Sequence, residues 1–178
     1  MTRFDAGAEL DAFLREAEEV VRLLAPDARA LAARSTEISG WSAIEHASHA
    51  TLANELVLRN LVNLARGAGL LVVADAAQDE RALEILAVGI LPRGQARSPR
   101  MVVPPTDVDL VMAREWAERF VQDLHGFRRG FDPRAEHARF FVPHQVLGPL
   151  DLAQWTRFGA VHTRHHLAIA REVLAALP

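Results

Sequence analysis

The stretch GWSAIEHASHATLANELVLRNLVNLARG, residues 40–67, has the features of one long helix. Ser42 and Glu45 near its start have the spacing of a capping box, in which each side chain accepts a hydrogen bond from the backbone N–H of the other residue. Gly67 at its end is a helix-stop signal, because glycine readily adopts the left-handed conformation that ends many helices. The stretch therefore predicts a long core helix.

Three more segments show helical periodicity, with apolar residues recurring at steps of three and four. Together they indicate four helices of roughly 18 to 26 residues, which favours a bundle. The alternating strand and helix pattern of a doubly wound sheet is missing, and Leu-Leu-Val-Val at 70–73 is too short to found a sheet. We therefore expect an all-α protein, a single domain over residues 1–178 that forms a four-helix bundle. The three further segments cover about residues 10–24, 107–126 and 151–176.

The ends of these helices also carry signals. Pro26 closes the first helix, Asp107 is a candidate N-cap for the third with Gly126 as its last residue, and a second capping box begins at Asp151. Roughly forty residues separate the second and third helices and include a short helix expected at 79–90, which is a crossover length and not a tight turn. The bundle should therefore have long crossover connections.

The composition excludes several classes of function. The chain has 178 residues, half of them apolar, a net charge of −3 and no cysteine. Without cysteine there is no protein thiol to act as nucleophile, redox centre or zinc ligand, so any sulfur chemistry must use sulfur from the substrate. All twenty basic residues are arginines that are spread along the chain and offset by carboxylates. We therefore expect no nucleic-acid partner.

The sequence indicates neither export nor membrane insertion. The first thirty residues lack the basic start and uninterrupted apolar stretch of a signal peptide, so we expect a cytoplasmic protein; carboxylates interrupt them, among them Glu9, Asp11, Glu16, Glu18 and Glu19. No apolar run approaches the ~18 to 20 residues that span a bilayer, so we expect no membrane partner. The most basic segment, LPRGQARSPR at 91–100, is rich in proline and glycine; it is typical of a solvated loop, with an anion-binding loop as the less favoured alternative.

Three of the eight histidines lie in VHTRHHLAIAREVL, residues 161–174. At about 100° per residue, His162 sits in the middle of the apolar stripe of its helix, His166 about 40° to one side and His165 about 60° to the other. Two histidines four residues apart on one helical face can reach the same metal ion. Taken alone, such a pair is more often a surface or hydrogen-bonded core pair, but two buried imidazoles without partners would be costly.

A third histidine lies on another core helix. His49 shares its face of the 40–67 helix with Leu52 and Leu56, which makes it an inward-facing residue. Glu45 lies one turn earlier on the same face and is a candidate catalytic base, although its capping-box spacing also explains it without catalysis. His46 is expected at the rim of a pocket or packed beside it.

These motifs resemble the DinB/YfiT-like superfamily of metal-binding four-helix bundles. The resemblance rests on a Trp-Ser that opens the second helix, a histidine eight residues after the Trp, and a His-x-x-x-His pair on the last helix. Trp41, His49, His162 and His166 match this pattern. The segment VPHQVLGPLDLAQWTRFGAVHTRHHLAIA also resembles an uncharacterised branch with an HP-x-x-G-x-L turn, except that Gln145 stands where that branch usually has proline.

The resemblance covers most of the chain, from about residue 30 to the end. It implies an up-down-down-up bundle and a site in which His49, His162 and His166 bind a divalent metal. Three neutral imidazoles leave coordination positions open for water or substrate, and nitrogen ligands suit zinc or nickel. His144, which precedes the Gly148-Pro149 turn, is expected near the pocket mouth or in a turn-stabilising hydrogen bond, and His165 in a flanking position beside the pocket.

Superfamily members with assigned activities include transferases that use low-molecular-weight thiols, a thiol-dependent isomerase and some hydrolases. We therefore expect a metal-dependent enzyme that acts on small molecules, most simply a thiol S-transferase-like enzyme. A non-catalytic metal- or ligand-binding stress-response protein and a metal-dependent hydrolase are the alternatives. Long amphipathic helices in this superfamily often pair, so a homodimer is also expected; Ile44, Leu58, Leu61 and Val62 could serve either an interior or a dimer contact.

Overall fold

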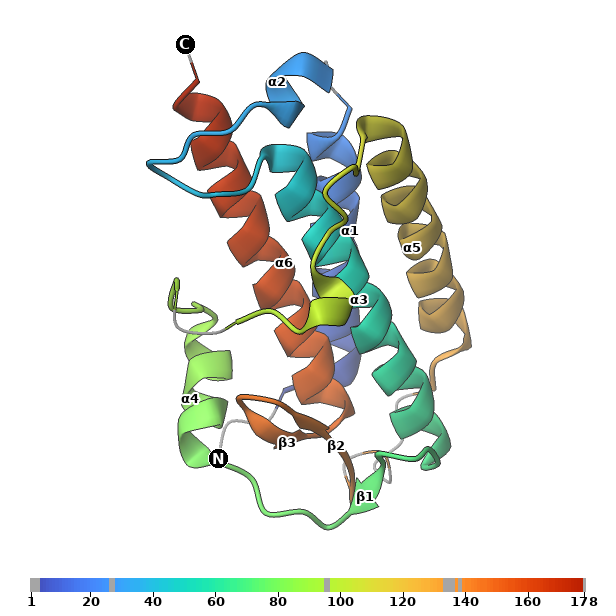
Figure 1. Cartoon of the computed structure of the whole chain (residues 1–178). Coiled ribbons are helices and arrows are strands. Elements are labelled where there is room, and N and C mark those ends of the chain that lie inside the picture. The colour runs from blue at the N-terminus through green and yellow to red at the C-terminus, as the bar shows by residue number, and fades with distance from the viewer. Residues whose placement is uncertain (1–3, 26–27, 95–96, 133–136, 138, 178) are drawn as a thin grey trace.

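Four long helices dominate the fold, and they lie side by side (Figure 1). The computed structural model describes residues 4–25, 28–94, 97–132, 137 and 139–177. Helix α6 makes its most extensive contacts with α3 and α1, and α5 packs against the same two helices. The prediction of a mostly helical protein is confirmed. The four helices are α1 (Ala6–Leu23), α3 (Ala43–Arg66), α5 (Leu110–Gly130) and α6 (Leu152–Ala175).

The helix starts mostly agree with the predicted caps. Ser42 and Glu45 form a complete capping box at the start of α3, and Asp151 and Gln154 form another at the start of α6. Gly67 ends α3 in the left-handed conformation, with φ of 60°. Pro26, expected to close the first helix, lies outside the described residues.

The predicted boundaries of α5 are wrong at both ends. The N-cap is Asp109, not Asp107, because the Asp109 carboxylate accepts a hydrogen bond of 2.8 Å from the Met112 backbone N–H. The helix also continues through Gly126 to Gly130. A glycine inside a helix costs only about 1 kcal/mol relative to alanine, and burial of Phe127 against the core outweighs that loss.

Shorter elements fill the connections in the described part of the chain. A small antiparallel sheet lies at the N-terminal end of α6 (Figure 1), with its strands in the order β1-β2-β3. The segment 70–73 was expected to be too short to found a sheet, yet Val73 pairs with Phe141, far away in the sequence. The fold is therefore mostly helical but not purely so. The shorter elements are α2 (Ala28–Ala32), β1 (Val73–Ala74), α4 (Glu80–Val88), the 3-10 helix η1 (Arg100–Val102), β2 (Phe140–His144) and β3 (Gly148–Leu150).

The apolar core fixes how closely the long helices approach. Phe13 of α1 is fully buried, and its ring centroid lies 5.7 Å from that of Phe120 of α5. Gly159 of α6 faces this ring, and a Cβ atom there would lie only 2.7 Å from Phe13 Cζ. The missing side chain at Gly159 therefore lets α6 pack directly on α1. Ile44 and Leu61 of α3 are also buried in the core. Of the two roles expected for them, interior packing and a dimer contact, these residues have the first.

The crossover from α4 to α5 runs over one side of the molecule. In Figure 1 it leaves α4, passes in front of α6 and α3, and carries η1 against α3 before it reaches α5. Arg157 of α6 donates to the Leu86 carbonyl at 3.0 Å and so holds α4 beside α6. Arg93 on the crossover forms a two-bond ion pair with Glu172 of α6, at 2.6 and 2.7 Å. No helix in the described part of the chain is long and apolar enough to cross a bilayer.

Candidate metal centre

Helices α3 and α6 bring three imidazoles together. One ligand atom each of His49, His162 and His166 lies within 4.8 Å of the other two, a spacing at which the group could hold a metal ion. Their ring centroids are 4.4 to 5.1 Å apart. The predicted set of ligands from two helices is therefore assembled in the structure.

His49 is oriented by the crossover segment. It is only 2% exposed, and its Nδ1 lies 2.7 Å from the carbonyl oxygen of Val102 in η1. Because a carbonyl can only accept, Nδ1 carries the proton and donates it. This leaves Nε2 with a free lone pair, and a histidine that donates its other ring N–H to a carbonyl is the usual arrangement of a metal ligand.

His166 is backed by a chain of hydrogen bonds. Its Nδ1 lies 3.0 Å from Nδ1 of His46, and Nε2 of His46 lies 2.8 Å from the Ser39 hydroxyl. If His166 donates to His46 and His46 donates to Ser39, each ring nitrogen in these two hydrogen bonds has a partner. The lone pair of His166 Nε2 then stays free for a metal. His46 is 3% exposed and does not line the cavity described below, so it stands behind a ligand and not at the rim.

His162 carries the clearest sign that a group is meant to bind here. Its Nδ1 is shielded from solvent and has no hydrogen-bond partner among the described residues. An unpaired buried polar atom costs free energy unless a ligand, ion or water satisfies it. One ring nitrogen of His162 lies close enough to those of His49 and His166 for the three to share a divalent cation, and the donor set suits such an ion.

Burial keeps the cluster uncharged. It lowers the pKa of His49, His162 and His166 below the usual value of 6.5, and for His162 and His166 the neighbouring imidazoles lower the pKa further. At neutral pH all three rings are therefore neutral. The neutral imidazole is the form that binds a metal, since protonation would occupy the lone pair.

Trp41 covers the cluster from the start of α3. Its ring centroid lies 5.0 Å from that of His49 and 6.4 Å from that of His166. It also lies 5.4 Å from the ring of His46, in an edge contact. In the sequence, Trp41 stands out only through its place in the Trp-Ser motif. The structure adds that it shields the imidazoles from solvent and forms part of the cavity wall.

The three ligands open into a cavity of about 860 Å³ between α3, α4, α6, the crossover and the β2-β3 hairpin. Pockets for small molecules commonly measure roughly 300 to 1,000 Å³, so this one suits a small-molecule ligand. Buried apolar side chains form much of its wall, among them Val57, Val142, Trp155, Phe158 and Ile169.

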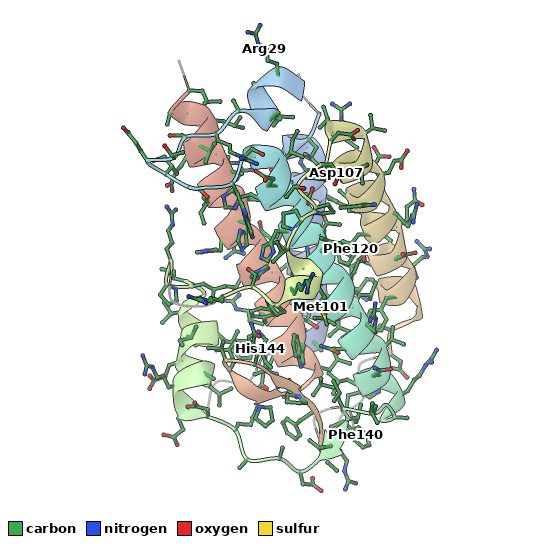
Figure 2. The ribbon with its side chains drawn as sticks, viewed as in Figure 1. Arg29, Met101, Asp107, Phe120, Phe140 and His144 are labelled. Atoms are coloured by element: carbon green, nitrogen blue, oxygen red, sulfur yellow. The ribbon has the colours of Figure 1, made fainter. Side chains whose placement is uncertain are left out.

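His144 serves both of the roles weighed for it. Its Nδ1 accepts hydrogen bonds from the backbone N–H groups of Val146 and Leu147, at 3.2 and 3.1 Å, which stabilises the turn between β2 and β3. Its ring also lines the cavity and packs edge-on against Phe158 at 4.5 Å. Burial lowers its pKa to about 4, so the ring is neutral. Figure 2 shows His144 below Met101, which lines the same cavity from η1.

His165 lines the cavity as a half-buried residue beside the ligands. Its ring meets that of His166 edge-on at 5.1 Å, and it is not one of the three residues that converge. Burial lowers its pKa as well. It is therefore available to touch a ligand in the cavity, which is the flanking position expected for it.

Glu45 is engaged elsewhere. Its carboxylate accepts from Arg34 Nη2 at 2.7 Å and Nε at 2.9 Å, and from the Ser42 backbone N–H at 2.8 Å. Burial alone would raise the pKa of Glu45, but these hydrogen bonds outweigh it and lower the pKa. Glu45 is not among the residues that line the cavity. Its observed role is the cap and ion-pair partner, and nothing in these contacts supports the candidate role as a base.

The scaffold under the ligands is itself polar and closely tied. Asn54 of α3 donates to the Thr163 hydroxyl of α6 at 2.9 Å, and Thr163 in turn donates to the Gly159 carbonyl at 2.7 Å. Both side chains are 1% exposed or less. This buried link fixes α3 against α6 beside His162, so the three ligands are held by a rigid pair of helices.

Some contributors could not be found from sequence. Ser39 and Val102 act on the site through contacts across 7 and 53 residues, and Arg34 pairs with Glu45 across 11 residues; no local pattern marks any of them. The sequence did point to the 91–100 loop, because its basic composition made an anion-binding loop the less favoured alternative to a solvated one. Arg93 and Arg97 of this loop do line the cavity, whereas residues 95 and 96 lie outside the described part.

Comparisons with protein-family models, with curated proteins and with solved structures find no match for this chain. Its function is therefore inferred from the chemistry of its own residues.

Proposed function

We propose that this chain is a metal-dependent enzyme that acts on small molecules, most simply a thiol S-transferase-like enzyme. The observation that carries the proposal is the convergence of three neutral imidazoles, His49, His162 and His166, on the wall of a cavity of about 860 Å³. A closed structural site would have no such space beside it. The DinB/YfiT-like, up-down-down-up bundle implied by the resemblance belongs to the same proposal, as do a cytoplasmic location and a homodimer.

The donor set limits which group can bind. Three nitrogen ligands without a carboxylate or a thiolate suit zinc or nickel better than the harder calcium or magnesium ions. A divalent ion of this kind supplies Lewis acidity, which lowers the pKa of a thiol or a water molecule beside it and so provides a nucleophile at neutral pH. His49 and His166 are pre-oriented for such an ion by Val102 and by His46.

The other residues prepare the cavity for a reaction. Trp41 shields the imidazoles from solvent, and the apolar walls exclude water, which strengthens electrostatic interactions inside. Because the chain has no cysteine, the sulfur must come from the substrate. His165 is the nearest titratable side chain on the wall that is not a ligand, so it is positioned to hold or move a proton of a bound molecule.

Transfer from a thiol is favoured over hydrolysis by the charges around the cavity. A hydrolase usually needs a carboxylate or similar base beside the ion to take a proton from water. Asp79 is the one carboxylate among the described lining residues, and it is exposed and caps α4. A thiol is more acidic than water and needs less help to lose its proton. The same lack of a carboxylate beside the histidines keeps a non-catalytic metal-binding protein as the second candidate.

Metal content is the first test. We expect one zinc or nickel ion per chain in the native protein by mass spectrometry, and its loss in His162→Ala. His125→Ala is the matched control, since His125 lies on α5 and contacts Glu18 at 3.2 Å, away from the cavity. A native protein without divalent metal, or a His162→Ala variant that retains it, would overturn the proposal.

Turnover is the second test. Metal-loaded protein is assayed with a panel of cellular thiols and small electrophiles, with loss of free thiol and formation of the thioether both measured. Transfer that depends on His162 supports the enzyme. Full metal loading without turnover on any pair would favour the binding protein instead.

A further inference from the structure

The cavity has two chemically different ends. At the inner end are the imidazoles, with His49 only 2% exposed. The exposed side chains of the lining, which we call its outer end, include Arg81 from α4 and Arg97 from the crossover. A molecule that fills the cavity would therefore meet neutral nitrogen donors at one end and guanidinium groups at the other.

The two outer arginines have uncommitted charge. The side chains of Arg81 and Arg97 form no ion pair or hydrogen bond with other described residues; only their backbone N–H and carbonyl groups are used. Arg93 differs, because Glu172 neutralises it through two hydrogen bonds. Asp79 lines the same cavity and keeps its negative charge while it caps the helix through the Arg81 backbone N–H, so the two arginines leave an excess of one positive charge over it.

The walls between the two ends are apolar. The inner walls carry buried Trp155 and Phe158, and near the mouth Met101 and Val146 are 71% and 58% exposed. Large apolar side chains left in water at a pocket mouth mark a surface that gains free energy when a ligand covers it. An ion or a small polar molecule would leave these surfaces wet, whereas a molecule with an apolar body would bury them.

We propose that the substrate of this cavity is an amphipathic acid, with an apolar body along the walls and an anionic end group at Arg81 and Arg97. The inference rests on the proposed function in one respect, because the inner end of the same molecule is taken to be the thiol that meets the histidines. It identifies the 91–100 loop as part of the substrate site through Arg97, and it makes Arg81 and Arg97 specificity-determining residues.

The test compares two probes that differ only at the outer end. These are an ω-mercapto carboxylic acid and the ω-mercapto alcohol of the same length, each in short, medium and long chains. Binding to cobalt-loaded protein is measured by calorimetry, and the thiolate-to-cobalt absorption in the near ultraviolet reports whether the sulfur reaches the ion. We expect the acid to bind about threefold to tenfold more tightly than the alcohol at the best chain length, as suits an exposed ion pair.

Variants then assign the preference to its residues. In Arg81→Gln/Arg97→Gln the acid should bind no better than the alcohol, while the affinity for the alcohol stays unchanged. Arg59→Gln is the matched control, because Arg59 is an exposed arginine of α3 that does not line the cavity. Thermal unfolding of all variants checks that the fold is retained, and each arginine is also replaced singly so that one failed variant does not decide the result.

The four outcomes separate the two proposals. Thiolate absorption together with an acid preference that the double variant loses supports both. Thiolate absorption without an acid preference, or with one that the double variant keeps, overturns the amphipathic acid and leaves the thiol chemistry standing. An arginine-dependent acid preference without thiolate absorption supports the acid site and overturns the thiol chemistry. If neither thiolate absorption nor an acid preference is observed, both proposals are overturned.

Discussion

The two halves of the helical core are built on different chemistry. All side chains in the described part that are both polar and buried lie on α3, with its cap Ser42, or on α6. The fully buried residues of helices α1 and α5 in the described part are all apolar, such as Phe13 and Phe120, and most of their charged side chains are more exposed, as in the pair Asp11 and Arg128; Glu9 of α1, at 14% exposed, is an exception. The α1 and α5 half is thus an ordinary hydrophobic scaffold.

This difference shows where buried polar groups cost the molecule stability. Every buried polar group must be satisfied by a partner, and an apolar core of the same size would avoid that requirement. The α3 and α6 half meets it for Asn54, Thr163 and His46 with hydrogen bonds between the two helices and to Ser39, whereas Ser48 Oγ is buried without a partner among the described residues. In this half, His162 Nδ1 is the one ring nitrogen of the described residues that is both shielded from solvent and without a hydrogen-bond partner, and His162 is one of the three residues proposed to bind the metal.

The largest expected effect tests whether the scaffold half is independent of the site. Phe13→Ala removes a fully buried ring from the α1 side and should lower the free energy of unfolding by about 3–5 kcal/mol. Urea denaturation measures the loss, and metal content per folded chain should stay at the native level. A variant that folds but no longer binds metal would show that the two halves are coupled.

The next effect tests the chain of hydrogen bonds behind His166. His46→Leu removes the acceptor of His166 Nδ1 and should weaken metal affinity by roughly 10- to 100-fold, as loss of a ligand's outer partner usually does. Competition with a chromophoric chelator measures the affinity. His46→Asn keeps an acceptor oxygen near the same place and should recover most of it. Equal affinity in the leucine and native proteins would refute a positioning role for His46.

The buried link between the two helices should show a third effect, on stability. Thr163→Val keeps the shape but leaves the Asn54 amide without a partner, at a cost of about 1–3 kcal/mol. The double variant Asn54→Leu/Thr163→Val replaces both polar partners and should lose less than the single one. If Thr163→Val unfolds at the same urea concentration as the native chain, the link contributes nothing.

The smallest effect concerns pH and the ion pair of Glu45. A lowered pKa in the folded protein means that the pair's stabilisation is complete above the usual glutamate value of 4.5 and is lost as pH falls through the folded value. Arg34→Met should therefore cost up to about 1 kcal/mol at pH 7, since Arg34 is half exposed, and the gap should close as pH falls below 4.5. Unfolding of the metal-free proteins across this range measures it. A gap that does not change with pH would mean that Arg34 acts by packing alone.

Much of the fold was predictable because its signals are local. Capping boxes at Ser42 and Asp151 and the helical phase of His162 and His166 depend on neighbours in sequence, and the structure agrees with each. The pairing of Val73 with Phe141 could not be predicted, since it joins distant segments. The boundaries of α5 were misjudged because a mid-helix Gly126 looks the same as a terminal one until Phe127 is seen to pack.

The candidate site divides in the same way. His49, His162 and His166 could be proposed from their positions on two helices. The placement of His46 behind His166, and of Glu45 against Arg34, depends on how α3 meets its neighbours in space, which no spacing along one helix can show. Both roles of His144 were predicted, because the side chain of a histidine before a tight turn can point either toward the turn or toward the pocket.

The hydrogen bond between His49 and the Val102 carbonyl has a consequence for the evolution and redesign of this protein. Val102 belongs to the same crossover that supplies Arg97 and Met101 to the cavity, so the segment that would be exchanged to alter substrate preference also sets the angle of a ligand ring. Under the two proposals, a change of this segment would therefore alter substrate specificity and metal affinity together. A library that varies this segment should keep the backbone from Arg100 to Val102 and vary the side chains around it.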